Sequence, residues 1–282
     1  SAVKLTEADV EYLLSFRESP GRTFVSNTFS GKYYTDAENL WIDCMMASIE
    51  RLNEIYSGRV LKYKVALAYY ALFQSCLVKR PFNLFHRNNL YLRMNEAARS
   101  FGNKTTWDKS FESLFKKFVD EINGFVFSNG EHNTVTNQDG FLIDDMRYDL
   151  VYIDPPYFSK DRSSVECDYS RMYHFLEGLA NYDIWDDLID YNSLNLRFKE
   201  NGYRWPENNS VLDRFDKLIG KLSRSIIVLS YKSPGIPREE ELVSMMRKHK
   251  RNVQVYRLPY QYALRKYRGE SSQNFELLII GQ

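Results

Sequence analysis

The spacing of apolar and polar positions divides the chain into a helical first part and a mixed second part. Thr6, followed by Asp9 three residues later, is a capping-box pattern that opens a helix. The stretch 60–78 is apolar nearly all round, which is typical of a helix at the centre of a bundle. The pattern predicts helices at 6–16, 36–56, 60–78 and 111–122, and a loop leading into another helix within 80–99.

After residue 123 the pattern changes to short β-rich runs. Most of these runs are separated by stretches with helical spacing at 171–182, 211–223 and 239–249. Strands that alternate with helices predict an α/β sheet with parallel strands. The last two runs have no helix between them, so we expect an antiparallel hairpin at the edge of the sheet. The predicted strands are 125–127, 150–153, 225–230, 253–258 and 275–281.

Composition narrows the class of protein. The chain has 282 residues, and its 15% aromatic content and net charge of +1 are the opposite of a disordered composition. Cys44, Cys76 and Cys167 are widely spaced and form neither a disulfide framework nor a zinc site. No His/Cys/Asp cluster has metal-ligand spacing, so no metal is expected. The longest apolar run, 65–78, is too short to span a bilayer. We therefore expect a soluble protein of the cytoplasm.

Charge is segregated along the chain although the total is near zero. Residues 59–118 contain twelve Lys/Arg and three Asp/Glu, whereas residues 144–190 contain twelve acids and four bases. Residues 247–268 contain eight bases and no acid. Interleaved with aromatics, this distribution indicates a nucleic-acid groove beside an acidic catalytic site. Solvated helix faces would give the same pattern, and charge alone does not decide between the two interpretations.

The segment DLVYIDPPYF at 149–158 is the motif with a chemical implication. It places Asp154-Pro155-Pro156-Tyr157 directly after a predicted buried strand, and ligands of open α/β sheets bind at the carboxyl ends of strands. Asp154 and the Pro155 carbonyl can each accept one N–H of an exocyclic amine, which frees the nitrogen lone pair for methyl transfer. The Tyr157 ring can stack on a base flipped out of a duplex. The alternative is a Pro-Pro strand terminator with an acid that caps the turn.

The chain resembles the α-class N6-adenine-specific DNA methyltransferases, the group that contains bacterial restriction–modification methylases and DNA adenine methylases. The D-P-P-Y at 154–157 matches motif IV of that family, and Asp139 lies where the family has an acid that contacts the adenosine part of S-adenosylmethionine. The resemblance covers roughly residues 36–282. Its other parts are KRPFNLFHRNNLYLR (79–93), RMYHFLEGLANYD (171–183), LSYKSPGIPREEEL (229–242), and the basic YALRKYR followed by FELLIIG.

This resemblance implies a Rossmann-like, S-adenosylmethionine-dependent methyltransferase sheet with a helical DNA-recognition subdomain. It divides the chain into an N-terminal helix with its connecting segment (1–35), a basic DNA-recognition subdomain (36–118) and a catalytic α/β region (119–282). The implied roles are catalysis by Asp154, Pro155, Pro156 and Tyr157; cofactor contacts by Asp139, Asp154 and Tyr157; a base pocket of Tyr157, Phe158 and Tyr231; and DNA contacts by Lys79, Arg80, Arg87, Asn88, Asn89, Arg93 and Lys232.

One feature of the family is missing from this sequence. The family opens with a glycine-rich loop of the type F-x-G-x-G that cradles the cofactor, but no two of the thirteen glycines here are two residues apart. We therefore expect that the chain lacks the first strand–helix–strand portion and that its sheet is incomplete at the N-terminus.

The predicted function is site-specific methylation of adenine N6 in double-stranded DNA, as the modification enzyme of a restriction–modification system with a cognate endonuclease. Two alternatives stay open. One keeps the chemistry but changes the substrate to cytosine N4 or to adenine in RNA, and the Asp at position 154 favours adenine because N4-cytosine enzymes more often carry Ser there. The other is a DNA-binding protein that lacks the cofactor loop and transfers no methyl group.

Overall fold

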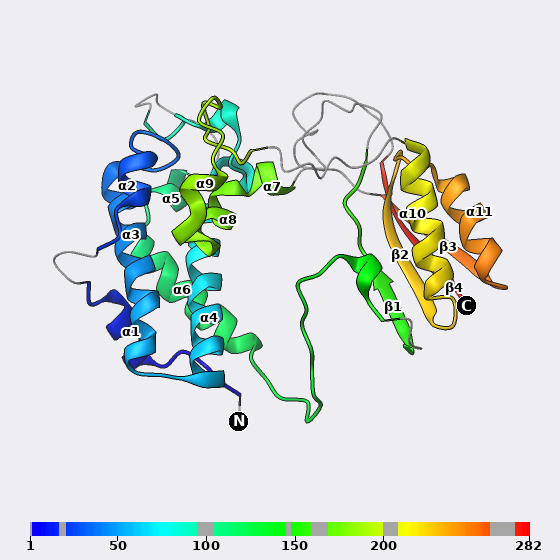
Figure 1. Cartoon of the computed structure of the whole chain (residues 1–282), viewed down its shortest axis with the longest axis horizontal. Helices are drawn as coiled ribbons and strands as arrows, with labels where there is room; N and C mark the ends of the chain where they lie inside the picture. The colour runs from blue at the N-terminus through cyan, green and yellow to red at the C-terminus, as the bar shows by residue number, and fades with distance from the viewer. Residues whose placement is uncertain are drawn as a thin grey trace. The chain divides into compact units, whose positions relative to one another are not determined.

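The computed structural model describes residues 2–16, 21–94, 104–144, 148–158, 169–199, 208–259 and 274–282. The chain forms two compact units. The first, here called the helical unit, comprises Ser1–Asn133 and Ser170–Lys199. The second, here called the sheet unit, comprises Thr134–Tyr169 and Glu200–Gln282. Figure 1 shows the elements of both units, and each unit is described below by itself.

Two helices of the helical unit begin at capping boxes that are recognisable in the sequence. The predicted capping box is confirmed, because Thr6 and Asp9 each bond the other's backbone N–H at the start of the first helix. Thr35 and Glu38 form a second capping box. The helices are α1 (Glu7–Leu14), α2 (Phe24–Thr28), α3 (Asp36–Glu50), α4 (Gly58–Val78), α5 (Lys104–Trp107), α6 (Phe111–Phe125), α7 (Tyr169–Met172), α8 (His174–Ala180) and α9 (Trp185–Leu188), with short 3₁₀ turns η1 (Arg51–Glu54), η2 (Pro81–Asn83), η3 (Arg87–Asn89) and η6 (Tyr182–Ile184).

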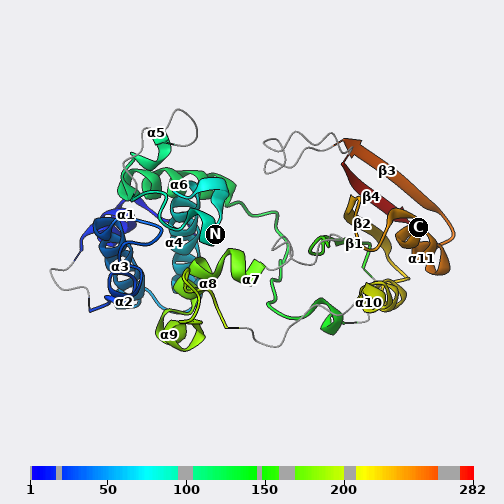
Figure 2. The ribbon, with the colours of Figure 1, turned by 90° about the horizontal axis from the view of Figure 1, so that it is seen from above.

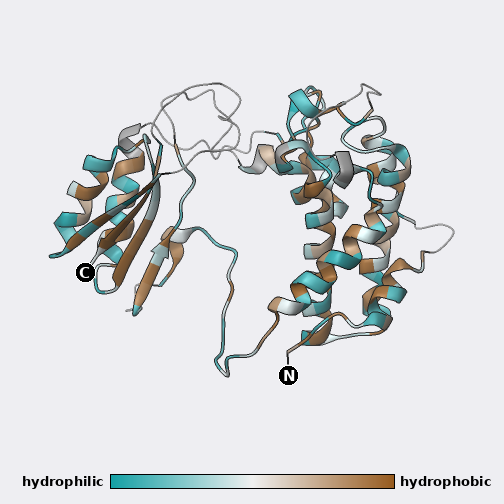
Figure 3. Cartoon of the chain, turned by 180° about the vertical axis from the view of Figure 1, so that it is seen from behind, coloured by the Kyte–Doolittle hydropathy of each residue, from teal (hydrophilic) through white to brown (hydrophobic). Residues whose placement is uncertain are grey.

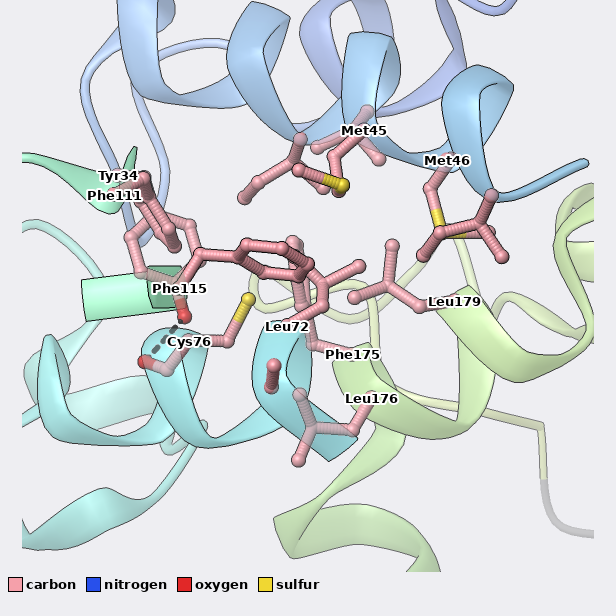
Figure 4. Packing of buried hydrophobic residues seen from close by; sticks show 14 of the residues in the cluster. Tyr34, Met45, Met46, Leu72, Cys76, Phe111, Phe115, Phe175, Leu176 and Leu179 are labelled. Atoms are coloured by element: carbon pink, nitrogen blue, oxygen red, sulfur yellow. Dashed lines mark hydrogen bonds between the residues drawn. The ribbon is translucent and has the colours of Figure 1, made fainter. Parts of the chain in front are cut away.

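Helix α4 contacts α3, α6 and α8. It buries one stripe of its surface and leaves Val60 and Tyr63 exposed, so it is not enclosed on all sides as its apolar sequence predicts. Its buried Leu72 and Cys76 face the methionines of α3 and the apolar side of α8 (Figure 4). The Tyr34 hydroxyl donates to the Cys76 carbonyl at 2.8 Å and fixes the loop before α3 against α4. Gly178 in α8 lies against the indole of Trp185, where an added Cβ would fall 1.8 Å from the ring.

The sheet unit contains a four-stranded mixed sheet in the order β1-β2-β4-β3. Strand β1 (Leu150–Ile153) pairs in parallel with β2 (Ile226–Ser233), and β4 (Phe275–Gly281) pairs antiparallel with both β2 and β3 (Val253–Pro259). The predicted hairpin of the last two strands is confirmed. Its last strand returns into the sheet beside β2, which makes the sheet mixed rather than parallel.

Helices α10 (Asn208–Lys221) and α11 (Glu239–His249) lie on the same side of the sheet (Figure 2). Ile227, Leu229 and Tyr231 of β2 alternate toward these helices and are fully buried. The strands themselves are largely apolar (Figure 3). On the opposite face, Tyr152, Tyr256 and Leu258 are more than half exposed. The 3₁₀ turn η4 (Gly140–Leu142) precedes β1.

Three sequence-based expectations differ from the structure. The run 125–127 is not a strand, because α6 continues its amphipathic pattern through Phe125. The helical segment within 171–182 exists, but α8 belongs to the helical unit rather than to the α/β region, since Phe175, Leu176 and Leu179 are buried in the core of that unit. The units consequently divide elsewhere than at residues 35 and 118. The basic segment 262–268, Cys167 and residues 95–99 of the predicted loop and helix lie outside the described residues.

No helix among the described residues is long and apolar enough to cross a membrane.

Candidate active site

The D-P-P-Y segment begins where β1 ends. Ile153 is the last residue of the strand and is buried, whereas the Asp154 side chain that follows it is exposed. Because β1 and β2 run in parallel with Ile153 opposite Leu229, Asp154 lies just past the carboxyl end of β1 and level with Ser230 of β2. The expected placement of Asp154 at the carboxyl end of a strand is therefore seen in the structure.

The Tyr157 hydroxyl joins three side chains at this edge. It donates to the Glu276 carboxylate, lies 3.2 Å from the Ser230 hydroxyl, and lies 3.4 Å from Oδ1 of Asp154. The Ser230 hydroxyl in turn donates to Glu276 at 3.1 Å. Burial and the hydrogen bond to the Glu276 carboxylate raise the pKa of the Tyr157 phenol well above its ordinary value, so Tyr157 is a neutral donor at physiological pH.

Tyr231 supports the segment from the core side. Its ring is fully buried and meets the Tyr157 ring edge-on, with 5.4 Å between centroids. Its hydroxyl accepts the Phe158 backbone N–H at 3.3 Å and donates to the Ile236 carbonyl. Ile236 in turn donates its N–H to the Phe158 carbonyl at 3.0 Å. These contacts hold the backbone of Phe158 and the ring of Tyr157, and the base-pocket role predicted for Tyr231 stays a prediction.

Asp139 lies upstream in the sheet unit and is exposed. It caps η4, and its Oδ1 accepts the Phe141 N–H at 3.0 Å. Lys221 of α10 donates to the Phe141 carbonyl at 2.9 Å and ties this turn to the helix. The second carboxylate oxygen of Asp139 can accept a hydroxyl or amine of an adenosyl group, and the 70% exposed Leu142 beside it offers an apolar surface.

Four of the residues that sequence assigned to DNA contacts are used inside the helical unit. Arg80 is fully buried, and its guanidinium donates to the backbone carbonyls of Tyr33 and Asn89 and, at 2.8 Å, to the Asn89 side chain. Burial lowers its pKa to about 10, so the side chain stays charged at neutral pH. Asn89 is also buried, and its amide donates to the Leu84 carbonyl at 3.1 Å. These contacts make Arg80 and Asn89 supports of the 79–90 loop instead of DNA contacts.

Lys79 and Arg93 both form ion pairs with Glu38. Lys79 lies 2.7 Å and Arg93 lies 2.6 Å from the Glu38 carboxylate, and the exposed fractions of the two cationic side chains are only 1% and 9%. Although burial alone would raise the pKa of Glu38, the bonds from Arg93 and Lys79 outweigh it and lower that pKa. Both cations are internal ion-pair partners, so neither offers a phosphate contact in this structure. Lys232, in β2, is also buried.

Arg87 and Asn88 differ from these four, because their side chains are exposed. They lie on the turn η3, which His86 caps by accepting the Asn88 N–H at 3.2 Å. Of the seven residues assigned to DNA, Arg87 and Asn88 are the two whose side chains face solvent.

Two further features of the described residues bear on ligands. An open pocket of about 780 Å³ lies in the helical unit, and its one cation, Arg22, is paired with Glu50 and Asp183 at 2.9 Å each. No group of three or more His, Cys, Asp or Glu side chains in the described part of the chain could hold a metal ion.

Sequence reasoning missed Ser230 and Glu276. Glu276 carries a visible signal, because it is the one charged residue in the otherwise apolar strand FELLIIG. Its role was hidden because Tyr157 and Glu276 are 119 positions apart, and only the return of β4 beside β2 brings them together.

The chain is similar to curated methyltransferases. It is 27% identical over 265 residues to the Type II methyltransferase M2.HphI of Haemophilus parahaemolyticus, a match that covers 92% of this chain and 71% of that protein. It is 29% identical over 176 residues to the Type II methyltransferase M.FokI of Planomicrobium okeanokoites, and 27% identical over 183 residues to the Modification methylase StsI of Streptococcus sanguinis. Each of these two matches covers 61% of this chain and 25% of the relative. No protein-family model and no solved structure matches the chain.

Proposed function

We propose that the chain is a DNA methyltransferase that transfers a methyl group from S-adenosylmethionine to N6 of adenine, within a restriction–modification system. The observation that carries this proposal is the exposed Asp154 carboxylate beside Tyr157 at the carboxyl ends of β1 and β2. The similarity to Type II methyltransferases supports the same reaction class and a Rossmann-like reading of the sheet. The substrate is double-stranded DNA, and a cognate endonuclease is the expected partner of such a system.

The chemistry assigned to the segment follows from the weak nucleophilicity of the adenine amine, whose lone pair is delocalised into the ring. Asp154 accepts one amine N–H and the Pro155 carbonyl accepts the other, which draws the nitrogen toward tetrahedral geometry. The half-buried Pro155 and Pro156 stiffen the backbone that carries both acceptors. Tyr157 and Phe158 provide the apolar surface for the flipped base, and stacking on such a ring contributes about 1–3 kcal/mol.

The cofactor contacts assigned to this chain are Asp139, Asp154 and Tyr157. Asp139 has one carboxylate oxygen bound to the Phe141 N–H and therefore holds its other oxygen in a fixed direction for the adenosyl group. When bound, S-adenosylmethionine would supply the methyl group: the bond from N6 to the methyl carbon forms as the sulfonium–methyl bond breaks, S-adenosylhomocysteine leaves, and one amine proton passes to Asp154 or to solvent. Arg87 and Asn88 are the proposed DNA contacts of the helical unit, because both are exposed.

The test is methyl transfer from labelled S-adenosylmethionine to duplex DNA by the wild-type chain and by Asp154→Ala. The substitution should lower transfer at least about a hundredfold, since it removes an acceptor aimed at the developing charge, while DNA retention stays within about twofold. Asn123→Ala is the control, because this residue lies in the helical unit and bonds the Leu5 backbone.

Mass spectrometry of the digested product identifies the methylated base. N6-methyladenine supports the proposal, and N4-methylcytosine would replace adenine by cytosine as the substrate. DNA retention without transfer by the wild-type chain would favour the DNA-binding alternative. Methyl transfer that persists in Asp154→Ala would show that Asp154 is not required for the reaction.

A further inference from the structure

We propose that Glu276 is a positioning residue for the reaction: it accepts the hydroxyl hydrogen of Tyr157 and thereby keeps Asp154 available to the substrate amine. This inference rests on the proposed function, because it assigns to Asp154 the task of accepting an amine N–H. It concerns a residue that touches neither the base nor the cofactor in the proposed scheme and that acts through Tyr157.

The position of Glu276 follows from the register of the sheet. Strand β4 runs antiparallel to β2, and Glu276 lies opposite Lys232 near the carboxyl end of β2. Ser230, two residues earlier on β2, points to the same face as Lys232 and therefore as Glu276. An acid at the start of β4 is thus placed at the edge of the sheet where Asp154 emerges from β1.

The Glu276 and Asp154 carboxylates compete for the single hydroxyl hydrogen of Tyr157. A tyrosine hydroxyl has one hydrogen to donate, and two carboxylates lie within reach of Tyr157. The Glu276 oxygen is the nearer acceptor, whereas the Asp154 oxygen lies at 3.4 Å, the far end of the hydrogen-bond range. Tyr157 therefore donates to Glu276, and Oδ1 of Asp154 retains its capacity to accept another donor.

Ser230 makes a further hydrogen bond to Glu276. Its hydroxyl donates to the same Glu276 oxygen at 3.1 Å and lies 3.2 Å from the Tyr157 hydroxyl. Glu276 thus receives two hydroxyl donors, which fix the carboxylate as well as the ring of Tyr157. The pKa of Tyr157 is raised by burial and by the Glu276 bond, which is the expected consequence of a phenol that donates to a carboxylate.

The consequence of losing Glu276 is specific. Without its nearer acceptor, the Tyr157 hydroxyl donates to Oδ1 of Asp154, which already lies 3.4 Å away. The substrate amine then competes with an internal donor for Asp154. The chemical step should suffer more than DNA binding, because DNA contacts elsewhere are unaffected.

The test is a double-mutant cycle on methyl transfer by the full chain with duplex DNA. Glu276→Leu should lower kcat about ten- to a hundredfold and change KM for DNA less than about threefold. Glu276→Gln keeps an oxygen acceptor at similar volume and should recover at least half of the lost rate on a logarithmic scale. In the Tyr157→Phe background, whatever its own rate, Glu276→Leu should cause less than about a twofold further change, because no hydroxyl is left to redirect.

A loss from Glu276→Leu that is equally large in the Tyr157→Phe background would overturn the proposal, since Glu276 would then act independently of the hydroxyl. Equal activity of Glu276→Leu and wild type would overturn it as well.

A second measurement separates this inference from the proposed reaction. The ¹³Cζ signal of Tyr157, assigned by its disappearance in Tyr157→Phe, responds to the hydrogen bond of the phenol and needs no enzymatic activity. It should move clearly in Glu276→Leu and less in Glu276→Gln. An unmoved signal refutes the contact even if the wild type methylates DNA. A moved signal in a chain that transfers no methyl group leaves the contact in place and refutes the reaction, and with it the role assigned to Glu276.

Discussion

The buried cations of the helical unit and the carboxylate that follows β1 in the sheet unit show two different uses of charge. In the helical unit, Lys64, Lys79 and Arg80 are buried and each is matched to an acid or to carbonyl oxygens. At the edge of the sheet unit, the Asp154 carboxylate is exposed, and its partner among the described residues is a hydroxyl at 3.4 Å. Matched buried charge serves the stability of the fold, whereas charge that is left exposed beside a stiff backbone is available for chemistry.

The largest expected effect comes from the buried pair Lys64–Asp9. Lys64→Met leaves the Asp9 carboxylate almost completely buried without its cation, and should lower the free energy of unfolding by about 3–5 kcal/mol. Lys62→Met, two residues earlier at an exposed position, is the matched control and should change it by less than about 0.5 kcal/mol. Urea unfolding followed by circular dichroism measures both. Equal effects of the two substitutions would contradict the contrast drawn between buried and exposed charge.

Arg80→Met should lower the free energy of unfolding by about 3 kcal/mol, because the carbonyls of Tyr33 and Asn89 lose a charged donor. The same substitution at the exposed Arg87 should have almost no effect on stability. Chemical denaturation of the two variants tests this directly. If Arg80→Met kept its stability and lost DNA affinity instead, Arg80 would be a DNA contact after all.

Acid should weaken the fold through Asp9. Burial would raise the pKa of this carboxyl, but the hydrogen bonds from Lys64, Tyr56 and Thr6 outweigh burial and lower it to about 2, from an ordinary value of 3.8. The unfolded chain then binds a proton more readily than the folded chain, so this stabilisation is complete above about pH 4 and is lost as the pH falls toward 2. A shift of this size corresponds to about 2 kcal/mol. The stability of wild type and Asp9→Asn, measured between pH 5 and pH 2, should converge toward the acidic end, and parallel curves would refute the assignment.

The smallest expected effect concerns the exposed residues Arg87 and Asn88 and their contacts with DNA. Arg87→Ala should weaken binding of duplex DNA a few-fold and lower the slope of log affinity against log salt by about 1, with unfolding unchanged. Asn88→Ala should leave the salt slope unchanged, because an amide releases no counterion. Fluorescence anisotropy at several salt concentrations gives these slopes. An unchanged slope for Arg87→Ala would mean that Arg87 contacts no phosphate.

The sequence was informative where a local pattern decides the structure. The capping box at Thr6 and the strand before Asp154 depend on neighbours within a few residues, and the final hairpin joins two strands that follow each other along the chain; all three are present. The assignment of cations was not local. The segment 79–93 shows four bases, but only the fold shows that Glu38, 41 positions before Lys79, neutralises two of them. Glu276 was missed for the same reason, since its partner Tyr157 is brought to it by the order of the strands.

The contact between Gly178 and Trp185 has a consequence for how this sequence can vary. Glycine inside a helix costs about 1 kcal/mol relative to alanine, yet even the methyl group of alanine would overlap the indole at 178. A library randomised at position 178 and selected for folded protein should therefore return glycine alone while Trp185 is present. Other residues at position 178 become possible only when position 185 changes as well, so we expect the two positions to covary.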